Sequence, residues 1–286
     1  MSQHVKKFFV AGATGQQGGG VSRSLLRNGQ YVRVLTRNAA KAEGLKKQGA
    51  EVFVGDLTDR PVLEKALGDV DGVFAMTTPF EAGMEAEVHQ GKTLADAAKD
   101  AGVAHYVFTS VGGADTHSGI PHFETKWNVE QHIRHIGLPA TILRPTFFMD
   151  NFGTIFHEAI LSGTLSLPML PKTKLQMIAV KDIGEFGAAA LLRPRDFIGH
   201  TIELAGDELT MPEVVAHLSR TMNRAINFQP MPDDQAKSAM GHDMATMFRW
   251  FNNVGYSADI SALRQRYRIA LTNFVELIAE VEWAKG

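Results

Sequence analysis

Residues Phe9–Gly20 read FVAGATGQQGGG, and this stretch decides the fold class. The apolar run Phe8–Ala11 has the composition of a short, fully buried strand. A glycine-rich turn follows it, and Val21–Leu26 (VSRSLL) predicts a helix. This order points backbone N–H groups at a helix N-terminus, where a pyrophosphate can bind. We therefore predict a dinucleotide-binding unit; a plain glycine-rich loop is the alternative.

The glycines of this turn have the spacing GxxGxxG. Gly12 would allow the tight turn after the strand, and Gly15 would allow close approach of the phosphates. Gly18 would let the helix pack closely on the strand. A glycine triplet alone is a weak signal, but a preceding strand and a following helix make it specific.

The first half of the chain alternates strand and helix patterns. We predict strands at Phe8–Ala11, Val32–Thr36, Glu51–Gly55, Gly72–Met76, Tyr106–Ser110 and Ala140–Leu143. We predict helices at Gly19–Arg27, Ala39–Gln48, Arg60–Leu67, Ala86–Ala101 and Phe123–His135. This alternation is typical of an α/β, Rossmann-type doubly wound parallel sheet with helices on both faces.

The regular alternation ends near Pro145. We predict a dinucleotide-binding domain over residues 1–150, and a smaller, mixed region over 151–286 that packs over the carboxyl edge of the sheet. In that region we expect short strands at Gln176–Val180 and Thr201–Leu204, with a helix at Ile183–Leu192 between them. We expect Asp182 to cap this helix, and Thr210 to begin another that ends near Met222.

The composition narrows the range of function classes. A formal net charge of −2 offers no overall attraction to nucleic acid, and we find no helix-turn-helix signature or basic recognition helix. The absence of cysteine excludes disulfides, thiolate catalysis and cysteine-ligated metals. No apolar run is long enough to span a bilayer, and the first strand leaves no room for a signal peptide. We expect a cytoplasmic protein without membrane or direct nucleic-acid contacts.

The histidines do not suggest a metal site. His132 and His135 are three residues apart on one predicted helix, and His117 and His122 lie upstream. No acidic residue has a zinc-like spacing with them, so we predict an exposed helix face and no metal.

The end of the second predicted strand bears on the choice of dinucleotide. NAD-specific sites usually carry an Asp or Glu there, which holds the ribose 2′-hydroxyl. This chain instead has Thr36 and Arg37, followed by Lys41. An arginine can bind a 2′-phosphate through a planar, charge-assisted pair, so we predict NADP(H). A solvated basic helix start is the alternative.

Polar residues also follow the third and fourth predicted strands. Asp56 and Leu57 come after the third strand, where the carboxylate would meet the adenine edge. Capping of the next helix is the alternative role for Asp56. Thr77, Thr78 and Pro79 end the fourth strand and face the same crevice.

These motifs together resemble the extended and atypical short-chain dehydrogenase/reductases. Active members pair a serine after the fifth strand with a Tyr-x-x-x-Lys motif on the next helix. Ser110 and Lys126 are present here, but His122 occupies the tyrosine position in HFETK. An imidazole can act as a general acid at neutral pH, so His122 is a candidate catalytic residue. A purely structural role at the helix start is the alternative.

A closer resemblance rests on GATGQQGG, VRVLTRN, QGAEVFVGD, EVHQGKTLADAA, HFETKWNVEQHI and MFRWF. The chain resembles the NmrA-like proteins, and in particular the NADPH-sensing redox regulators among them. The resemblance implies NADP(H) bound by a set of residues that extends to the aromatic segment Phe147–Asp150. Those residues are Gly12, Ala13, Thr14, Gly15, Gln16, Gln17, Arg37, Lys41, Thr77, Thr78, Pro79, Lys126, Phe147 and Phe148. His89 stands where the sensor pattern has a lysine.

Two functions remain open. The first is a redox sensor whose conformation or oligomeric state follows the NADPH level, with an unidentified protein partner. The second is an NADPH-dependent reductase of quinones or similar apolar electrophiles. Aromatic and methionine side chains would line its pocket, unless they form core instead; they are Phe147, Phe148, Phe152, Phe156, Met244, Met247, Phe248 and Phe251.

Overall fold

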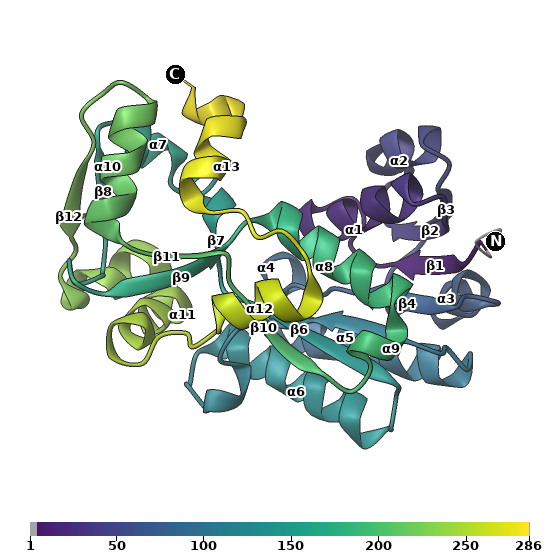
Figure 1. Ribbon diagram of the computed structural model, residues 1–286. Helices are drawn as coiled ribbons and strands as arrows, with labels where there is room; N and C mark the ends of the chain where they lie inside the picture. Colours follow the sequence, from purple (N-terminus) through teal and green to yellow (C-terminus); the bar gives the residue numbers. More distant parts are fainter. Residues whose placement is uncertain (1–4, 286) are drawn as a thin grey trace.

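The computed structural model describes residues 5–285, and its main feature is a parallel sheet of seven strands (Figure 1). The strand order is β10-β6-β5-β4-β1-β2-β3. The strands are β1 (Lys7–Val10), β2 (Tyr31–Thr36), β3 (Glu51–Val54), β4 (Gly72–Ala75), β5 (Tyr106–Thr109), β6 (Ala140–Pro145) and β10 (Thr201–Leu204). This is the predicted Rossmann-type doubly wound sheet, in which the order of strands reverses beside β1.

Helices cover both faces of this sheet because side chains alternate along each strand. Phe8 packs on one face of β1, and Phe9 packs on the other. The first face carries α1 (Gln16–Arg27), α8 (Val180–Leu192), α9 (Pro194–Phe197) and α12 (Ile260–Tyr267). The second carries α3 (Arg60–Leu67), α5 (Met84–Asp100) and α6 (Pro121–His135). The connection from β2 to β3 contains η1 (Ala39–Ala42) and α2 (Glu43–Lys47), and α4 (Pro79–Ala82) follows β4.

The remaining elements form a smaller part beside the carboxyl edge of the sheet (Figure 1). Its strands are β7 (Phe147–Phe148), β8 (Thr164–Leu167), β9 (Lys174–Ile178), β11 (Asp207–Thr210) and β12 (Asn227–Pro230). Its helices are α7 (His157–Leu161), α10 (Met211–Thr221), α11 (Asp233–Asn253) and α13 (Phe274–Glu280). The chain also returns from this part to the large sheet, because β10 pairs in parallel with β6. The domain boundary at residue 150 remains a prediction.

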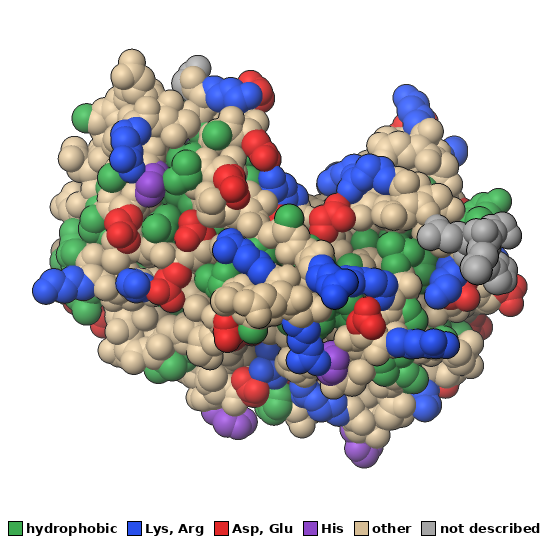
Figure 2. Space-filling model, in the orientation of Figure 1, with side chains coloured by type: hydrophobic (Ala, Val, Ile, Leu, Met, Phe, Trp, Pro, Cys, Tyr) green, Lys and Arg blue, Asp and Glu red, His purple; other side chains and the backbone are tan. Residues whose placement is uncertain are grey.

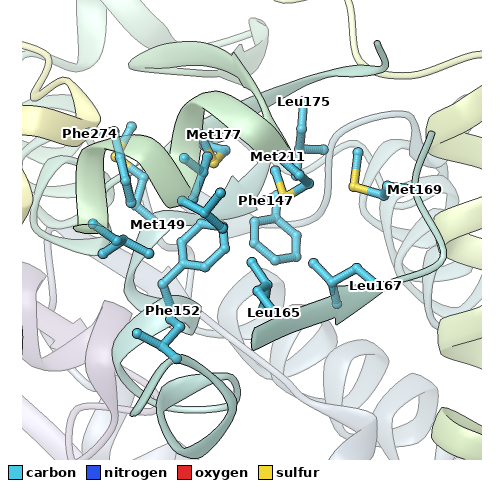
Figure 3. Close-up of a cluster of buried hydrophobic side chains, with 14 of the residues drawn as sticks. Phe147, Met149, Phe152, Leu165, Leu167, Met169, Leu175, Met177, Met211 and Phe274 are labelled. Atoms are coloured by element: carbon cyan, nitrogen blue, oxygen red, sulfur yellow. The ribbon is translucent and has the colours of Figure 1, made fainter. Parts of the chain in front are cut away.

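The aromatic cluster predicted from the sequence is mostly core of the smaller part. Figure 3 shows Phe147 and Phe152 among methionine and leucine side chains from neighbouring elements. Phe248 and Phe251 are buried in the same cluster, and Phe156 packs against it. The core interpretation of these residues is therefore correct.

Two helix caps that the sequence predicts after residue 150 test its interpretation. Thr210 forms a capping box with Glu213 at the start of α10, as expected. The expected cap by Asp182 is wrong, because α8 begins at Val180, two residues before Asp182, and its start has no side-chain cap. The Asp182 carboxylate instead accepts hydrogen bonds from the backbone N–H and hydroxyl of Thr272, at 2.6 and 2.9 Å.

Candidate functional site

A cavity of about 270 Å³ opens where β1, β2, β3 and β4 end. The end of β2, the four connections that follow these strands and one residue of α5 form its walls. The lining residues are Gly12, Thr14, Gly15, Leu35, Thr36, Arg37, Asn38, Lys41, Gly55, Asp56, Leu57, Met76, Thr77, Thr78, Glu81 and Gln90. Open α/β sheets bind ligands at this carboxyl edge, next to the point where the strand order reverses.

The glycine turn leaves the first helix end open toward this cavity. Gly12 has a φ of +64°, a conformation that glycine adopts without strain. Gly15 precedes α1, which has no side-chain cap and no acidic residue in its first turn. Gly18 lies so close to the turn that an added Cβ would be 2.5 Å from the carbonyl of Gly12. The free N–H groups of α1 and its helix dipole therefore favour an anion here.

The end of β2 places positive charge at the same cavity. Arg37 and Lys41 both line it, and Asn38 caps η1 by accepting a hydrogen bond from the N–H of Ala40 at 3.0 Å. Arg37 forms an ion pair with Glu81 of α4, so the two lining side chains meet across the cavity. Both are more than half exposed, and an incoming phosphate could replace the carboxylate as the partner of Arg37.

Asp56 and Leu57 also line the cavity. The carboxylate of Asp56 accepts hydrogen bonds from the backbone N–H and hydroxyl of Thr58, at 3.0 and 2.9 Å. The residue that caps α3 is Asp59, which accepts from the N–H of Val62. The alternative role of Asp56 as the helix cap is therefore wrong, and the residue lies in the cavity wall.

Lys126 reaches the cavity wall from α6. Its ammonium group donates a hydrogen bond of 2.6 Å to the carbonyl oxygen of Thr77, a lining residue. The same group lies 2.9 Å from the carboxylate of Glu87, which is fully buried. Thr125 donates a hydrogen bond to the other oxygen of Glu87. Lys126 is thus a charged group held in place beside the cavity by a buried counter-ion.

Ser110 is not directed at Lys126. Its hydroxyl donates a 2.5 Å hydrogen bond to the buried carboxylate of Glu130. Arg144 donates to both oxygens of the same carboxylate, at 3.0 and 2.8 Å, and forms an ion pair with Asp115. Burial alone would lower the pKa of Arg144, but the hydrogen bonds and charges of the two carboxylates outweigh this and raise it. Ser110 therefore belongs to a buried ionic cluster.

His122 pairs with an acidic residue from the smaller part. Its Nδ1 lies 2.8 and 2.7 Å from the two carboxylate oxygens of Asp243 in α11. Its backbone N–H donates a further bond of 3.1 Å to one of these oxygens. Gly241, with a φ of +81°, makes a kink in α11 just before Asp243. Burial opposes ionisation of Asp243, but the hydrogen bonds and charge of His122 lower its pKa below the usual value.

The predicted site residues divide into two groups. Those that line the cavity are Gly12, Thr14, Gly15, Arg37, Lys41, Asp56, Leu57, Thr77 and Thr78. Those that do not are Ala13, Gln16, Gln17, Gly18, Pro79, Ser110, His122, Lys126, Phe147 and Phe148. Gln17 accepts a hydrogen bond from Thr109, and Phe147 is buried in the core of the smaller part.

Sequence reasoning missed several residues at these sites. Glu81 and Gln90 line the cavity, and only their proximity to the Thr77–Pro79 motif could have indicated them. Asp243 carried no signal, because it lies 121 residues from His122 in the chain. The described residues 5–285 contain no group of three or more His, Cys, Asp or Glu side chains that could hold a metal. Within the same range no helix is both long and apolar enough to cross a bilayer.

The chain belongs to the NmrA-like family, whose model matches residues 4–278. It is 33% identical to an NAD(P)H azoreductase of Xenophilus azovorans, over 81% of this chain and 79% of the relative. It is 29% identical to the nitrogen metabolite repression protein nmrA of Emericella nidulans, over 83% and 71% of the two chains. The relatives of this chain therefore include a reductase and a repression protein.

Solved structures share the fold over nearly the whole chain. An NADPH-dependent quinone oxidoreductase of Escherichia coli, determined in complex with NADPH, superposes with a TM-score of 0.81 and 25% identity. The superposition covers 95% of this chain and 98% of that one. The relatives therefore confirm the family and the fold predicted from the motifs.

Proposed function

We propose that this chain binds NADP(H) in the cavity at the carboxyl edge of the sheet and acts as a redox sensor. The carrying observation is that one cavity combines an uncapped helix N-terminus, with no acidic residue in its first turn, and two basic side chains after β2. The helix end suits the pyrophosphate, and Arg37 and Lys41 suit a 2′-phosphate. The quinone oxidoreductase with the same fold was determined with NADPH bound, which supports this choice.

Two further features support a sensing role. Ser110 and Lys126 are each held by a different buried glutamate, and His122 stands where active reductases have the tyrosine. Helix α6 contacts the cavity wall through Lys126 and the smaller part through His122. A cofactor that moves Lys126 can therefore act on both parts of the molecule, which is what a sensor requires. The relative named for nitrogen metabolite repression fits this role.

The test is to compare the protein alone with the protein saturated with NADPH, NADP⁺ or NADH. Small-angle scattering reports shape and assembly, and limited proteolysis reports local exposure. We expect a change in shape or exposure with NADPH that NADP⁺ or NADH does not reproduce. A ligand that binds both conformations of the protein equally well shifts no equilibrium, so a sensor of NADPH must bind one conformation more tightly when NADPH is the ligand. Identical profiles under all four conditions would rule out the sensor.

The second candidate function is an NADPH-dependent reductase of quinones or azo compounds. The observation that favours it is an exposed aromatic ring beside a histidine: Phe80 is 71% exposed, and its ring centroid lies 5.9 Å from that of His122. An apolar, planar acceptor could stack on such a ring. The azoreductase and quinone oxidoreductase relatives agree with this class of acceptor. Loss of NADPH absorbance with a panel of quinones and azo dyes tests it.

A further inference from the structure

The pair formed by His122 and Asp243 has the geometry of an acid–base group. The Asp243 carboxylate lies within 2.8 Å of the imidazole Nδ1 through both of its oxygens. A carboxylate accepts hydrogen bonds and cannot donate them, so the Nδ1 atom carries a proton. This fixes the orientation and tautomer of the ring and leaves Nε2 as the atom that can exchange a proton with a ligand.

The second ring nitrogen is accessible. The His122 side chain is 13% exposed, and within residues 5–285 its hydrogen bonds use the backbone N–H and Nδ1 but not Nε2. Because Nε2 is not one of the buried atoms that lack a partner in this range, it contacts solvent. The ring of Phe80 lies beside it, and Phe80 is the most exposed large apolar side chain of residues 5–285. An apolar ligand that covers Phe80 would therefore also meet the imidazole.

His122 and Phe80 both lie next to the proposed cofactor cavity. Thr78 and Glu81 line the cavity, and Phe80 lies between them in α4. Lys126, one helical turn after His122, donates to the carbonyl of Thr77 in the same wall. A ligand on Phe80 would thus lie beside the wall of this cavity.

We propose that His122, oriented by Asp243, is the proton donor for the reduction of a conjugated apolar electrophile, such as a quinone or an azo compound. The inference rests on NADP(H) binding and on the second candidate function. NADPH, when bound, supplies the hydride. The acceptor gains the hydride at one atom, and its oxygen or nitrogen takes the proton as the Nε2–H bond breaks. The imidazole is then neutral and regains its proton from water, while Asp243 remains a carboxylate throughout.

The charged groups near the pair have partners of their own. Lys126 and Glu87 compensate each other, and Glu81 of α4 is paired with Arg37. His242 precedes Asp243 in α11, and its charge also lowers the pKa of Asp243. Asp243 therefore places its carboxylate against the Nδ1 side of the ring, opposite the Nε2 atom that donates the proton.

The experiment compares wild-type protein with His122→Gln and Asp243→Asn. Calorimetry first measures NADPH binding, and turnover is then measured with menadione and with the azo dye methyl red. We expect NADPH affinity to change less than about twofold, while kcat falls about 100-fold in His122→Gln. In Asp243→Asn we expect kcat to fall about tenfold, because the ring loses the carboxylate that fixes its orientation and tautomer.

The same helix offers a matched control. His132 of α6 pairs with Asp96 at 2.7 Å, far along the helix from His122. His132→Gln and Asp96→Asn remove a similar pair and should leave kcat unchanged. A proton NMR spectrum gives a readout without cofactor, because the hydrogen-bonded Nδ1 proton of His122 should give a low-field signal. That signal should vanish in His122→Gln and persist in His132→Gln.

The outcomes separate the proposals. Absence of NADPH binding in the wild type would overturn the proposed function itself. Binding without turnover of either acceptor would overturn the acid–base inference and leave the sensor standing. Turnover that survives His122→Gln, or that falls equally in the His132 control, would also overturn it.

Discussion

The ammonium group of Lys126 lies 2.9 Å from the carboxylate of Glu87, and the Glu87 side chain is completely buried. Thr77 and Thr125 donate additional hydrogen bonds to this carboxylate. A buried charge is costly unless it is paired, so each partner depends on the other. The pair holds α6 against the strand end that forms one wall of the cavity.

Removal of one partner should destabilise the protein strongly. Glu87→Gln leaves the ammonium of Lys126 without its counter-ion, so we expect the free energy of unfolding to fall by about 3 kcal/mol. The double variant Glu87→Gln with Lys126→Met should regain part of this lost stability, because it no longer contains an unpaired buried charge. Urea denaturation measures both. The exposed Glu85→Gln on the same helix is the control, and an equal effect there would contradict the interpretation.

The ion pair of Arg37 and Glu81 gives a prediction on cofactor choice. Arg37→Ala should weaken NADPH binding about 10- to 100-fold and change NADH binding little, because only NADPH carries the 2′-phosphate. Glu81→Gln should strengthen NADPH binding a few-fold, since it frees Arg37 from a competing carboxylate. Calorimetric titration with both cofactors measures these changes. Lys47→Ala, a charge change on exposed α2, is the control; equal losses for the two cofactors in Arg37→Ala would refute the assignment.

The glycine turn allows a matched pair of substitutions. An alanine Cβ at Gly18 would lie 2.5 Å from the backbone of Gly12, which has no flexible end that could move away. We expect Gly18→Ala to cost about 3 kcal/mol of stability and to abolish NADPH binding. Gly44→Ala in α2 meets nothing within 4 Å, so it should stabilise the protein by about 0.5 kcal/mol. Thermal unfolding distinguishes the two, and similar shifts in melting temperature would contradict this reading of the turn.

The sequence was sufficient for features set by neighbouring residues. The unit β1–turn–α1 and the alternation of strands and helices follow from local patterns, as does the basic end of β2. Local chemistry also indicated the capping box at Thr210. Local chemistry gave the wrong prediction at Asp182, because a carboxylate near a helix start can equally bind a distant segment. Here it accepts a hydrogen bond from the backbone N–H of Thr272.

Contacts between distant segments were not predictable. The engagement of Ser110 by Glu130, and of Lys126 by Glu87, depends on how α5 and α6 pack on the sheet. The pairing of His122 with Asp243 depends on the placement of α11, which no periodicity in a single sequence specifies. The candidate chemistry of this chain lies in these contacts, so the sequence could indicate the cofactor site more fully than the reacting groups.

The lowered pKa of Asp243 predicts a pH-dependent contribution to stability. A carboxyl group whose pKa is lower in the folded than in the unfolded state stabilises the fold at pH values above its unfolded pKa. That contribution is lost as the pH falls through the folded value, because the proton then binds in both states. Wild type should therefore be more stable than Asp243→Asn at pH 6, and the difference should shrink toward pH 3. Urea unfolding across this range measures it, with Asp234→Asn on the exposed start of α11 as the control. A difference that stays constant with pH would show that the ionised carboxylate of Asp243 does not stabilise this contact.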